Sequence, residues 1–340
     1  MNKEYFLDVT IEQNINEYFD TLDKNKLLIF SPTSIKKIKI SNKKIQMENW
    51  HNITKNKQKI DKYIESINSR INEIITFGGG SVIDIGKYIA YKLNIKCTCI
   101  PSMLSTNSYA TNKVAIIENG KKITLNAKMP DKIIIDNTVL KLSEKENLYG
   151  LADVLSIYTA LYDWKIANKD INEKIDENIY AEAENLLVEV MKFINTNSFD
   201  KITGNNLKLF EFIGKAGYIT NLYGTGRPES GSEHILAKEI ESRIDIPHGM
   251  SVSIGILIMS LIQDRYNLNV EKAIMKMNIL EDSYSYGLTK EIIKQSSLDV
   301  KLREDRYTVI NRNRKSEKEK IMIIDKVYNI INEVGNNVNN

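Results

Sequence analysis

The sequence predicts an α/β domain with a parallel sheet over residues 1–142, followed by an all-α domain over residues 143–340. In the first half, short apolar runs alternate with helical patterns, as they do in a doubly wound sheet. From about Ser143 onward, apolar residues recur at spacings of three and four, which is typical of helices. A chain of 340 residues is long enough for two such domains, each with its own core.

Several apolar segments of the first half predict strands covered on both faces, since such strands are apolar throughout. They span residues 26–32, 43–47, 73–77 and 96–101. A hairpin is predicted over residues 113–126, because Asn119 and Gly120 separate two alternating runs and favour a tight turn. Residues 130–136 then predict one more strand, which returns to the sheet.

The composition narrows the class of protein. The 47 basic and 44 acidic residues leave a formal charge of +3, and the lysines are spread along the chain, which argues against nucleic acid as the main partner. No segment predicts a membrane span, and residues 1–8 have no apolar stretch behind a basic flank, so we expect neither insertion nor a secretory signal. Cys97 and Cys99 alternate on a predicted strand as reduced core thiols, which suits a cytoplasmic protein.

A glycine-rich loop follows the strand predicted at residues 73–77, and a helical pattern comes directly after it. The loop consists of Gly78, Gly79 and Gly80. Glycines let backbone amides approach a pyrophosphate, and the start of a helix attracts the same anion. Asp84 and Lys87 lie on the first turns of that helix, and Ser81 joins the glycines as a candidate cofactor residue. The alternative is a tight turn without a ligand, since the usual G-x-G-x-x-G is absent.

Three side chains of the second half predict a metal site. Asp153 lies in a segment that is apolar nearly all round, where an ionised carboxylate is costly unless a cation compensates it. His234 and His248 offer neutral imidazoles, and three protein ligands leave open positions on a catalytic metal. The alternative is two unrelated histidines with Asp153 satisfied by hydrogen bonds. Ser230 or Ser232 is predicted to cap the helix that carries His234.

These segments together resemble the sn-glycerol-1-phosphate dehydrogenase family. The resemblance rests on F-G-G-G-S-V-I-D-I-G-K (77–87), G-L-A-D-V-L-S-I-Y-T-A-L-Y-D-W (150–164), R-P-E-S-G-S-E-H (227–234) and P-H-G-M-S-V-S-I-G (247–255), with R-E-D-R-Y-T-V-I (303–310) similar as well. This family belongs with glycerol dehydrogenase, iron-containing alcohol dehydrogenases and dehydroquinate synthase. The resemblance implies a dehydroquinate synthase-like fold, with a cleft between its two domains that holds NAD or NADP and one divalent metal, zinc, with iron or nickel as alternatives.

The resemblance also assigns roles to single residues. The metal ligands of the family match Asp153, His234 and His248. Its pyrophosphate and ribose region matches Gly78, Gly79, Gly80 and Asp84. Ser102 and Ser105 match positions that contact the nicotinamide end in relatives. Asn107 departs from the pattern, because relatives carry an aspartate there beside the substrate hydroxyls, and an amide forms hydrogen bonds but holds no negative charge.

The resemblance therefore implies a metal-dependent, NAD(P)-linked oxidoreductase that forms a homo-oligomer. Its substrate pair is a small polyol or polyol phosphate (glycerol or glycerol 1-phosphate) and the ketone (dihydroxyacetone or dihydroxyacetone phosphate). The catalytic residues are then Asp153, His234, His248 and Asn107.

Some alternatives stay open. Arg227, Lys113 and the loop around Gly224 and Gly226 are candidate phosphate donors, or else a surface charge and an ordinary loop. A cyclase of the dehydroquinate synthase kind is a rival function, although relatives of that kind carry a more elaborate phosphate and lysine set. A second rival is a non-catalytic nucleotide-binding relative, in which Asn107 is a sign of lost activity.

Overall fold

The computed structural model describes residues 9–12 and 14–336, which divide into two compact units. The first unit spans the chain to Asn147 and also includes Asn206–Tyr218, and the second unit comprises Leu148–Asn205 and Ile219 onward. The structure thus groups residues 206–218 with the α/β unit, inside the span that the sequence assigns to the helical domain. Residues 1–8, where the sequence shows no signal pattern, lie outside the described residues.

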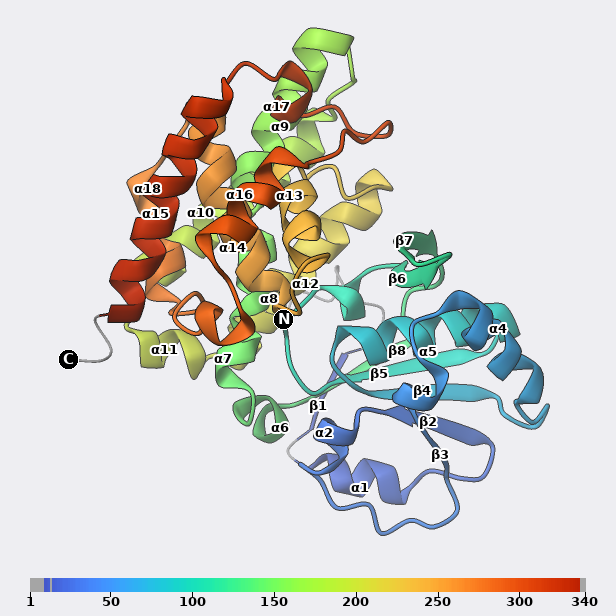
Figure 1. The fold of residues 1–340 in the computed structure, drawn as a ribbon. Helices are drawn as coiled ribbons and strands as arrows, with labels where there is room; N and C mark the ends of the chain where they lie inside the picture. Colours follow the sequence, from blue (N-terminus) through green and yellow to red (C-terminus); the bar gives the residue numbers. More distant parts are fainter. Residues whose placement is uncertain (1–8, 13, 337–340) are drawn as a thin grey trace. The chain divides into compact units, whose positions relative to one another are not determined.

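The first unit is built on a six-stranded sheet in which every neighbouring pair of strands is parallel (Figure 1). In spatial order the strands are β1 (Val9–Glu12), β8 (Lys132–Asp136), β5 (Lys96–Pro101), β4 (Glu73–Gly78), β2 (Lys26–Phe30) and β3 (Gln46–Asn49). The predicted strands are confirmed, with shifted ends. Two differences concern the edges of the sheet: β3 begins three residues later than predicted, and β1 was not predicted at all.

Helices cover both faces of this sheet, which explains why its central strands are apolar throughout. On one face, α5 (Gly80–Leu93) crosses β4 so closely that a Cβ atom at Gly86 would lie 2.0 Å from Thr76 Cγ2. On the other face, α1 (Ile15–Asp20) places Phe19 edge-on against Phe77, with ring centroids 5.7 Å apart. Short helices α2 (Pro32–Ile35) and α3 (Trp50–Ile53) and the longer α4 (Lys57–Ser66) complete this region.

The predicted hairpin is confirmed as β6 (Lys113–Glu118) and β7 (Lys121–Asn126), an antiparallel pair of its own. Asn119 and Gly120 both have positive φ, 52° and 75°, as the tight turn requires. After β8 come α6 (Asn137–Lys141) and α7 (Glu144–Asn147).

Part of one long helix completes the first unit. Residues 206–218 open α12 (Asn206–Tyr223), and Tyr109 of the short helix η1 (Ser108–Ala110) stacks on Phe210 at a centroid distance of 4.9 Å. The Tyr109 hydroxyl also donates to the Phe210 carbonyl, at 2.9 Å. These contacts explain why this stretch of helix packs with the α/β unit.

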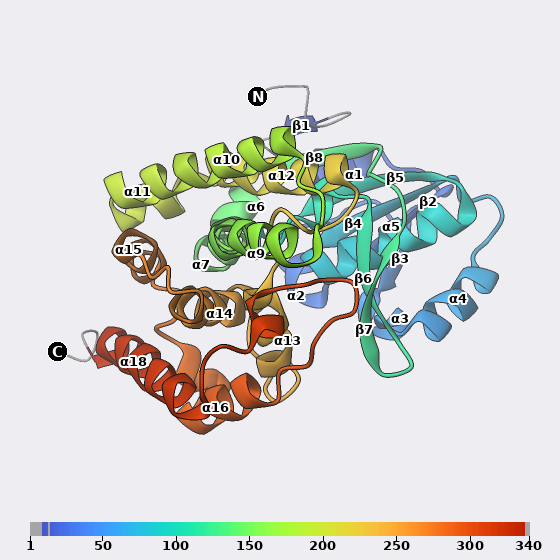
Figure 2. The same ribbon diagram turned by 90° about the horizontal axis from the view of Figure 1, so that it is seen from above.

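The named elements of the second unit are all helices, as the sequence predicts. They are α8 (Tyr149–Leu155), α9 (Ile157–Ile171), α10 (Glu177–Thr196), α11 (Phe199–Thr203), α13 (Ser232–Glu241), α14 (His248–Ile262), α15 (Leu268–Lys276), η2 (Ser283–Tyr286), α16 (Lys290–Leu298), α17 (Val309–Arg312) and α18 (Glu317–Asn336). Helix α14 is buried nearly all round and contacts α8, α9, α13 and α18. Figure 2 shows it between α9 and α18. Among the described residues, no helix combines the length and apolarity that crossing a bilayer requires.

Candidate metal centre and cofactor loop

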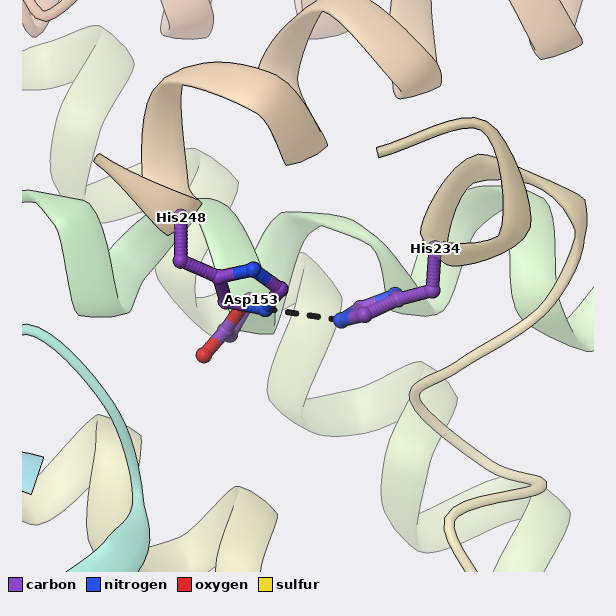
Figure 3. A group of neighbouring side chains, drawn as sticks. All are labelled: Asp153, His234 and His248. Atoms are coloured by element: carbon purple, nitrogen blue, oxygen red, sulfur yellow. Dashed lines mark ion pairs between the residues drawn. The ribbon is translucent and has the colours of Figure 1, made fainter. Parts of the chain in front are cut away.

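The structure brings Asp153, His234 and His248 together from α8, α13 and α14 of the second unit (Figure 3). Asp153 Oδ1 lies 3.6 Å from His234 Nε2 and 3.4 Å from His248 Nε2. One ligand atom from each residue lies within 4.8 Å of the other two. Ligands that share a zinc ion at about 2.1 Å are separated by roughly 3.4 Å in a tetrahedral site, so these atoms are spaced to share one cation.

The environment of the Asp153 carboxylate also indicates that a cation binds between these three residues. Its Oδ1 is buried and has no hydrogen-bond partner, although two imidazole nitrogens face it. A buried carboxylate oxygen is costly without a partner, and two imidazoles and a carboxylate are the ligands that a divalent transition metal accepts. The three residues present therefore fit a divalent metal ion.

Glycines let the backbones of these helices approach one another. Gly249, next to His248, lies against α8, where a Cβ atom would be 2.5 Å from Tyr149 Cα. Gly255 lies against α13, where a Cβ atom would be 2.5 Å from the Glu233 carbonyl oxygen. Because any larger residue at either position would push the helices apart, these glycines set the spacing of the triad.

The helix that carries Asp153 is shorter than the sequence suggests. The continuous apolar pattern predicts one helix through Trp164, but α8 ends at Leu155 and α9 begins at Ile157. Ser156 lies at the junction, and its Oγ donates to the Asp153 carbonyl oxygen at 2.5 Å. Asp153 therefore lies in the last turn of a short helix.

The predicted caps of α13 were wrong. Neither Ser230 nor Ser232 caps the helix with its side chain, and the N-cap residue is Gly231. Instead, the backbone N–H of Ser232 donates to Asp163 Oδ2 at 2.7 Å, and that of Gly231 donates to Glu233 Oε1 at 2.5 Å. The reason is tertiary: α9 packs so close to the start of α13 that a carboxylate takes the place of a local cap.

Asp163 joins three segments of the second unit. In addition to the amide of Ser232, it accepts the backbone N–H of Val309 at the start of α17, at 2.8 Å. Its side chain is fully buried, and burial, followed by repulsion from Glu233, raises its pKa to about 6. Asp163 thus holds α9, α13 and α17 together at an electrostatic cost.

Each histidine of the triad also contacts a glutamate through its other ring nitrogen. His234 Nδ1 lies 2.8 Å from Glu233 Oε1, and His248 Nδ1 lies 2.5 Å from Glu241 Oε1. In both rings Nε2 is the nitrogen that faces Asp153. Neither glutamate was predicted from the sequence, although Glu233 directly precedes His234 in the chain.

The carboxylates determine the protonation of His234. Burial on its own would lower the pKa of this imidazole, but Asp153 and Glu233 outweigh burial and raise the pKa to about 9. Burial would raise the pKa of Glu233, yet hydrogen bonds, first from His234, lower it. In the absence of a cation, His234 is therefore a protonated imidazole between two carboxylates.

The glycine loop lies where the sequence predicts it, between β4 and α5 of the first unit. Helix α5 begins at Gly80, and its N-cap residue Gly79 supplies no side-chain cap. A Cβ atom at Gly80 would lie 2.6 Å from Thr106 Oγ1, and one at Gly78 would lie 2.6 Å from Val82 Cγ2. At Gly78 a side chain would also meet Val82 Cβ at 2.8 Å, and at Gly80 the Thr106 side chain would have to move. Ser81 follows as the next residue of α5.

The predicted nicotinamide and substrate residues lie on a neighbouring loop of the same unit. Ser102 is buried, receives a hydrogen bond from Ser34 or donates one to it at 2.7 Å, and donates its N–H to the Gly78 carbonyl at 3.0 Å. Ser105 and Asn107 are half-buried further along this loop. The structure thus groups these residues with the glycine loop, and their roles stay predictions.

The carboxylate of Asp84 interacts with other groups of the protein. Its carboxylate accepts the N–H of Ala115 in β6 at 3.0 Å and lies 3.9 Å from Lys55 Nζ and 4.0 Å from Lys87 Nζ. Burial raises its pKa in spite of these cations. Asp84 therefore anchors the hairpin to α5, and its match to the ribose region rests on the resemblance alone.

Arg227 is neither a surface charge nor part of an ordinary loop. It is buried, its Nε lies 2.9 Å from Glu173 Oε1, and its Nη2 donates to the Tyr307 carbonyl at 2.9 Å. This guanidinium ties the loop before α13 to the segment before α17. Lys113, the other candidate phosphate donor, contacts Asn126 across the hairpin.

Known proteins resemble this chain in sequence over much of its length. Residues 13–143 match the family "Iron-containing alcohol dehydrogenase". The glycerol-1-phosphate dehydrogenase [NAD(P)+] of Methanococcus aeolicus is 32% identical over 209 residues, which cover 59% of this chain and 60% of that protein. The enzyme of the same name from Sulfurisphaera tokodaii is 30% identical over 275 residues, 76% of this chain and 77% of that protein. That from Pyrococcus horikoshii is 29% identical over 274 residues, 76% and 78% respectively.

Solved structures share the fold at lower identity. Glycerol dehydrogenase from Schizosaccharomyces pombe matches with a TM-score of 0.63 and 15% identity, covering 98% of this chain and 92% of that one. A probable glycerol dehydrogenase from Sinorhizobium meliloti matches with a TM-score of 0.65 and 14% identity, covering 96% and 97%. These likenesses establish the architecture, and the sequence identity across three quarters of both chains establishes the family. The chain belongs to the glycerol-1-phosphate dehydrogenase family, whose members are NAD(P)-dependent oxidoreductases related to the iron-containing alcohol dehydrogenases.

Proposed function

We propose that this protein interconverts glycerol 1-phosphate and dihydroxyacetone phosphate by hydride transfer with NAD or NADP, at a divalent metal held by Asp153, His234 and His248. Membership of the family makes the chain an NAD(P)-linked oxidoreductase of polyols or polyol phosphates. The names of its relatives favour the phosphorylated substrate. The single observation that supports a metal-assisted reaction is that three ligand atoms, one from each of these residues, lie within 4.8 Å of one another.

The residues of the triad suit the role of holding the metal. A cation held there would favour loss of the proton from the substrate hydroxyl, and a bound nicotinamide would supply the hydride acceptor. Asp153 contributes a negative charge, and the two imidazoles contribute neutral nitrogen atoms through Nε2. Zinc is the metal that we propose, because it accepts this mixed set of nitrogen and oxygen ligands, with iron and nickel as alternatives.

The glycine loop suits the role of holding the cofactor. No side chains cover the backbone where α5 begins, because residues 78–80 are all glycine. The N-terminus of this helix of fourteen residues carries a partial positive charge that attracts a pyrophosphate. We assign Ser81, Ser102 and Ser105 to the same cofactor region, because the last two lie on the loop next to the glycines.

A steady-state assay tests the proposal. Dihydroxyacetone phosphate and dihydroxyacetone are each supplied with NADH and with NADPH, and oxidation of the cofactor is followed by its absorbance. We expect turnover of dihydroxyacetone phosphate with a kcat/KM higher than that of dihydroxyacetone, and about one divalent metal ion per chain by elemental analysis. Absence of turnover with both ketones, in protein that contains its metal, would overturn the proposal in favour of a cyclase or a non-catalytic relative.

A homo-oligomeric state and a cytoplasmic location remain predictions. Light scattering coupled to size-exclusion chromatography tests the first, and a single-chain mass at micromolar concentration would contradict it. Cell fractionation tests the second.

A further inference from the structure

We infer that Glu233 and Glu241 are positioning residues, each of which orients one histidine of the triad so that Nε2 faces the shared cation. The inference rests on the proposed function, since it presupposes that Asp153, His234 and His248 bind a metal. It goes beyond that function because it assigns a role to two carboxylates that do not themselves touch the metal position.

Both imidazole rings of the triad are oriented in the same way. An imidazole can coordinate through either nitrogen, and a carboxylate that accepts the Nδ1 proton leaves Nε2 as the coordinating atom. Both histidines show this arrangement, with Nδ1 at 2.8 Å from Glu233 and at 2.5 Å from Glu241. Two rings on different helices thus receive the same support from separate carboxylates.

Glu233 is fixed independently of the histidine that it contacts. Its side chain has no exposed surface. Oε1 accepts the N–H of Gly231 at 2.5 Å, and Oε2 accepts the hydroxyl of Thr159 at 2.7 Å. Because groups from the preceding loop and from α9 hold this carboxylate, it is in place before any metal binds.

Glu241 is the last residue of α13, and its Oε1 accepts the hydroxyl of Ser251 at 2.8 Å as well as the Nδ1 proton of His248. Its side chain is 18% exposed, in contrast to that of Glu233. Glu241 also links α13 to the first turn of α14, so it connects the helices that carry the two histidines.

This arrangement predicts that glutamine and alanine have different effects when they replace Glu233 or Glu241. Glutamine keeps the shape and can still accept the Nδ1 proton, whereas alanine removes the acceptor. At position 233 the glutamine amide can donate to Thr159, whose hydroxyl can also accept, so Glu233→Gln retains the local contacts. Loss of such a supporting carboxylate weakens metal binding by roughly 10- to 100-fold.

The experiment measures zinc affinity by competition with a chelator and the visible spectrum after replacement with Co²⁺, whose absorption bands report ligand geometry. Proteins compared are the parent, Glu233→Ala, Glu233→Gln, Glu241→Ala and Glu241→Gln. We expect roughly 10- to 100-fold weaker zinc binding and an altered Co²⁺ spectrum in both alanine variants, and a smaller change in the glutamine variants.

A matched control comes from the same helix. Glu239 lies on α13 and pairs with Arg243 at 2.8 Å, so Glu239→Ala removes a carboxylate that supports no histidine in the described structure. Its zinc affinity and Co²⁺ spectrum should equal those of the parent protein. The thermal midpoint of each metal-free protein separates a change in folding from a change in metal binding.

The outcomes distinguish this inference from the function on which it rests. A parent protein that binds no divalent metal would contradict the proposed metal centre itself. A parent that binds zinc, with alanine variants that bind it as tightly and with the same Co²⁺ spectrum, would contradict the positioning role only. Should Glu233→Ala fail to fold, the more exposed Glu241 and the two glutamine variants decide the question.

Discussion

Gly249 of α14 lies so close to Tyr149 of α8 that a Cβ atom at this position would be 2.5 Å from Tyr149 Cα and 2.6 Å from Tyr149 O. The glycine directly follows His248, and α8 carries Asp153 four residues after the tyrosine. The contact between the two backbones therefore sets the distance between two of the three candidate ligands. No rotamer change relieves such a clash, because Tyr149 Cα and O belong to the main chain and the main chain also fixes the position of Tyr149 Cβ, which is 2.6 Å away.

We expect Gly249→Ala to separate α8 from α14 and to lower both stability and metal content. Overpacking of this kind costs about 1–3 kcal/mol of the free energy of unfolding. Denaturation in urea and elemental analysis measure the two effects. The control is Gly226→Ala, since a Cβ atom there meets nothing closer than Ser230 Cβ at 3.7 Å. A Gly249→Ala protein with parental stability and metal content would show that the helices adapt without moving the triad.

Substitution of Asp153 by asparagine tests the metal centre directly. The amide is a neutral and weaker ligand, and the two imidazoles alone leave the cation without a charged partner. We expect loss of bound metal and a fall in kcat/KM of roughly a thousandfold, since a catalytic cation is worth several kcal/mol. Asp170→Asn is the control, because Asp170 pairs with Arg312 at 2.6 Å in another part of the unit. Full metal content in the Asp153 variant would exclude this residue as a ligand.

The architecture could be predicted because its signals are local. Central strands such as β4 are covered on both faces, and their apolar runs show this directly. The hairpin follows from Asn119 and Gly120, whose backbone conformation few other residues adopt. The strand β1 escaped prediction because Val9–Glu12 is a short edge strand and its apolar residue Ile11 is exposed.

The site could be predicted only in part, because its supporting contacts join residues that are distant in the sequence. Asp153, His234 and His248 are recognisable as residue types that bind metals. The supporting contacts depend on helix packing: Asp163 reaches the start of α13 from α9, which no spacing in the sequence reveals. Glu241 is likewise seven residues from His248 in the chain, and only the angle between α13 and α14 brings them together.

The pKa of Asp163 predicts a pH dependence of stability. Burial and the nearby Glu233 raise this pKa from 3.8 to about 6, so the folded protein binds the proton more tightly than the unfolded chain does. The contribution is fully present below about pH 4 and is lost as the pH rises through 6. We therefore expect the free energy of unfolding of the metal-free protein to fall between pH 4 and pH 6, as the stabilising contribution of protonated Asp163 is lost.

The variant Asp163→Asn isolates that contribution. Asparagine has one side-chain oxygen, whereas the two carboxylate oxygens accept the N–H groups of Ser232 and Val309. One amide therefore loses its acceptor, at about 1–3 kcal/mol. Urea denaturation from pH 4 to pH 7 should show a less stable variant with a flatter pH profile than the parent. Parallel profiles would mean that Asp163 does not titrate in this range.

Asn107 provides a test of substrate preference. Under the proposed function it lies where relatives carry an aspartate beside the substrate hydroxyls, and Asn107→Asp adds a negative charge that repels a phosphate. At an effective dielectric constant near that of water the repulsion is about 1 kcal/mol, so we expect a roughly fivefold fall in kcat/KM for dihydroxyacetone phosphate relative to dihydroxyacetone. Asn269→Asp adds the same charge at an exposed position in the first turn of α15 and should leave the ratio unchanged. An unchanged ratio in the Asn107 variant as well would mean that this residue does not face the phosphate-bearing substrate.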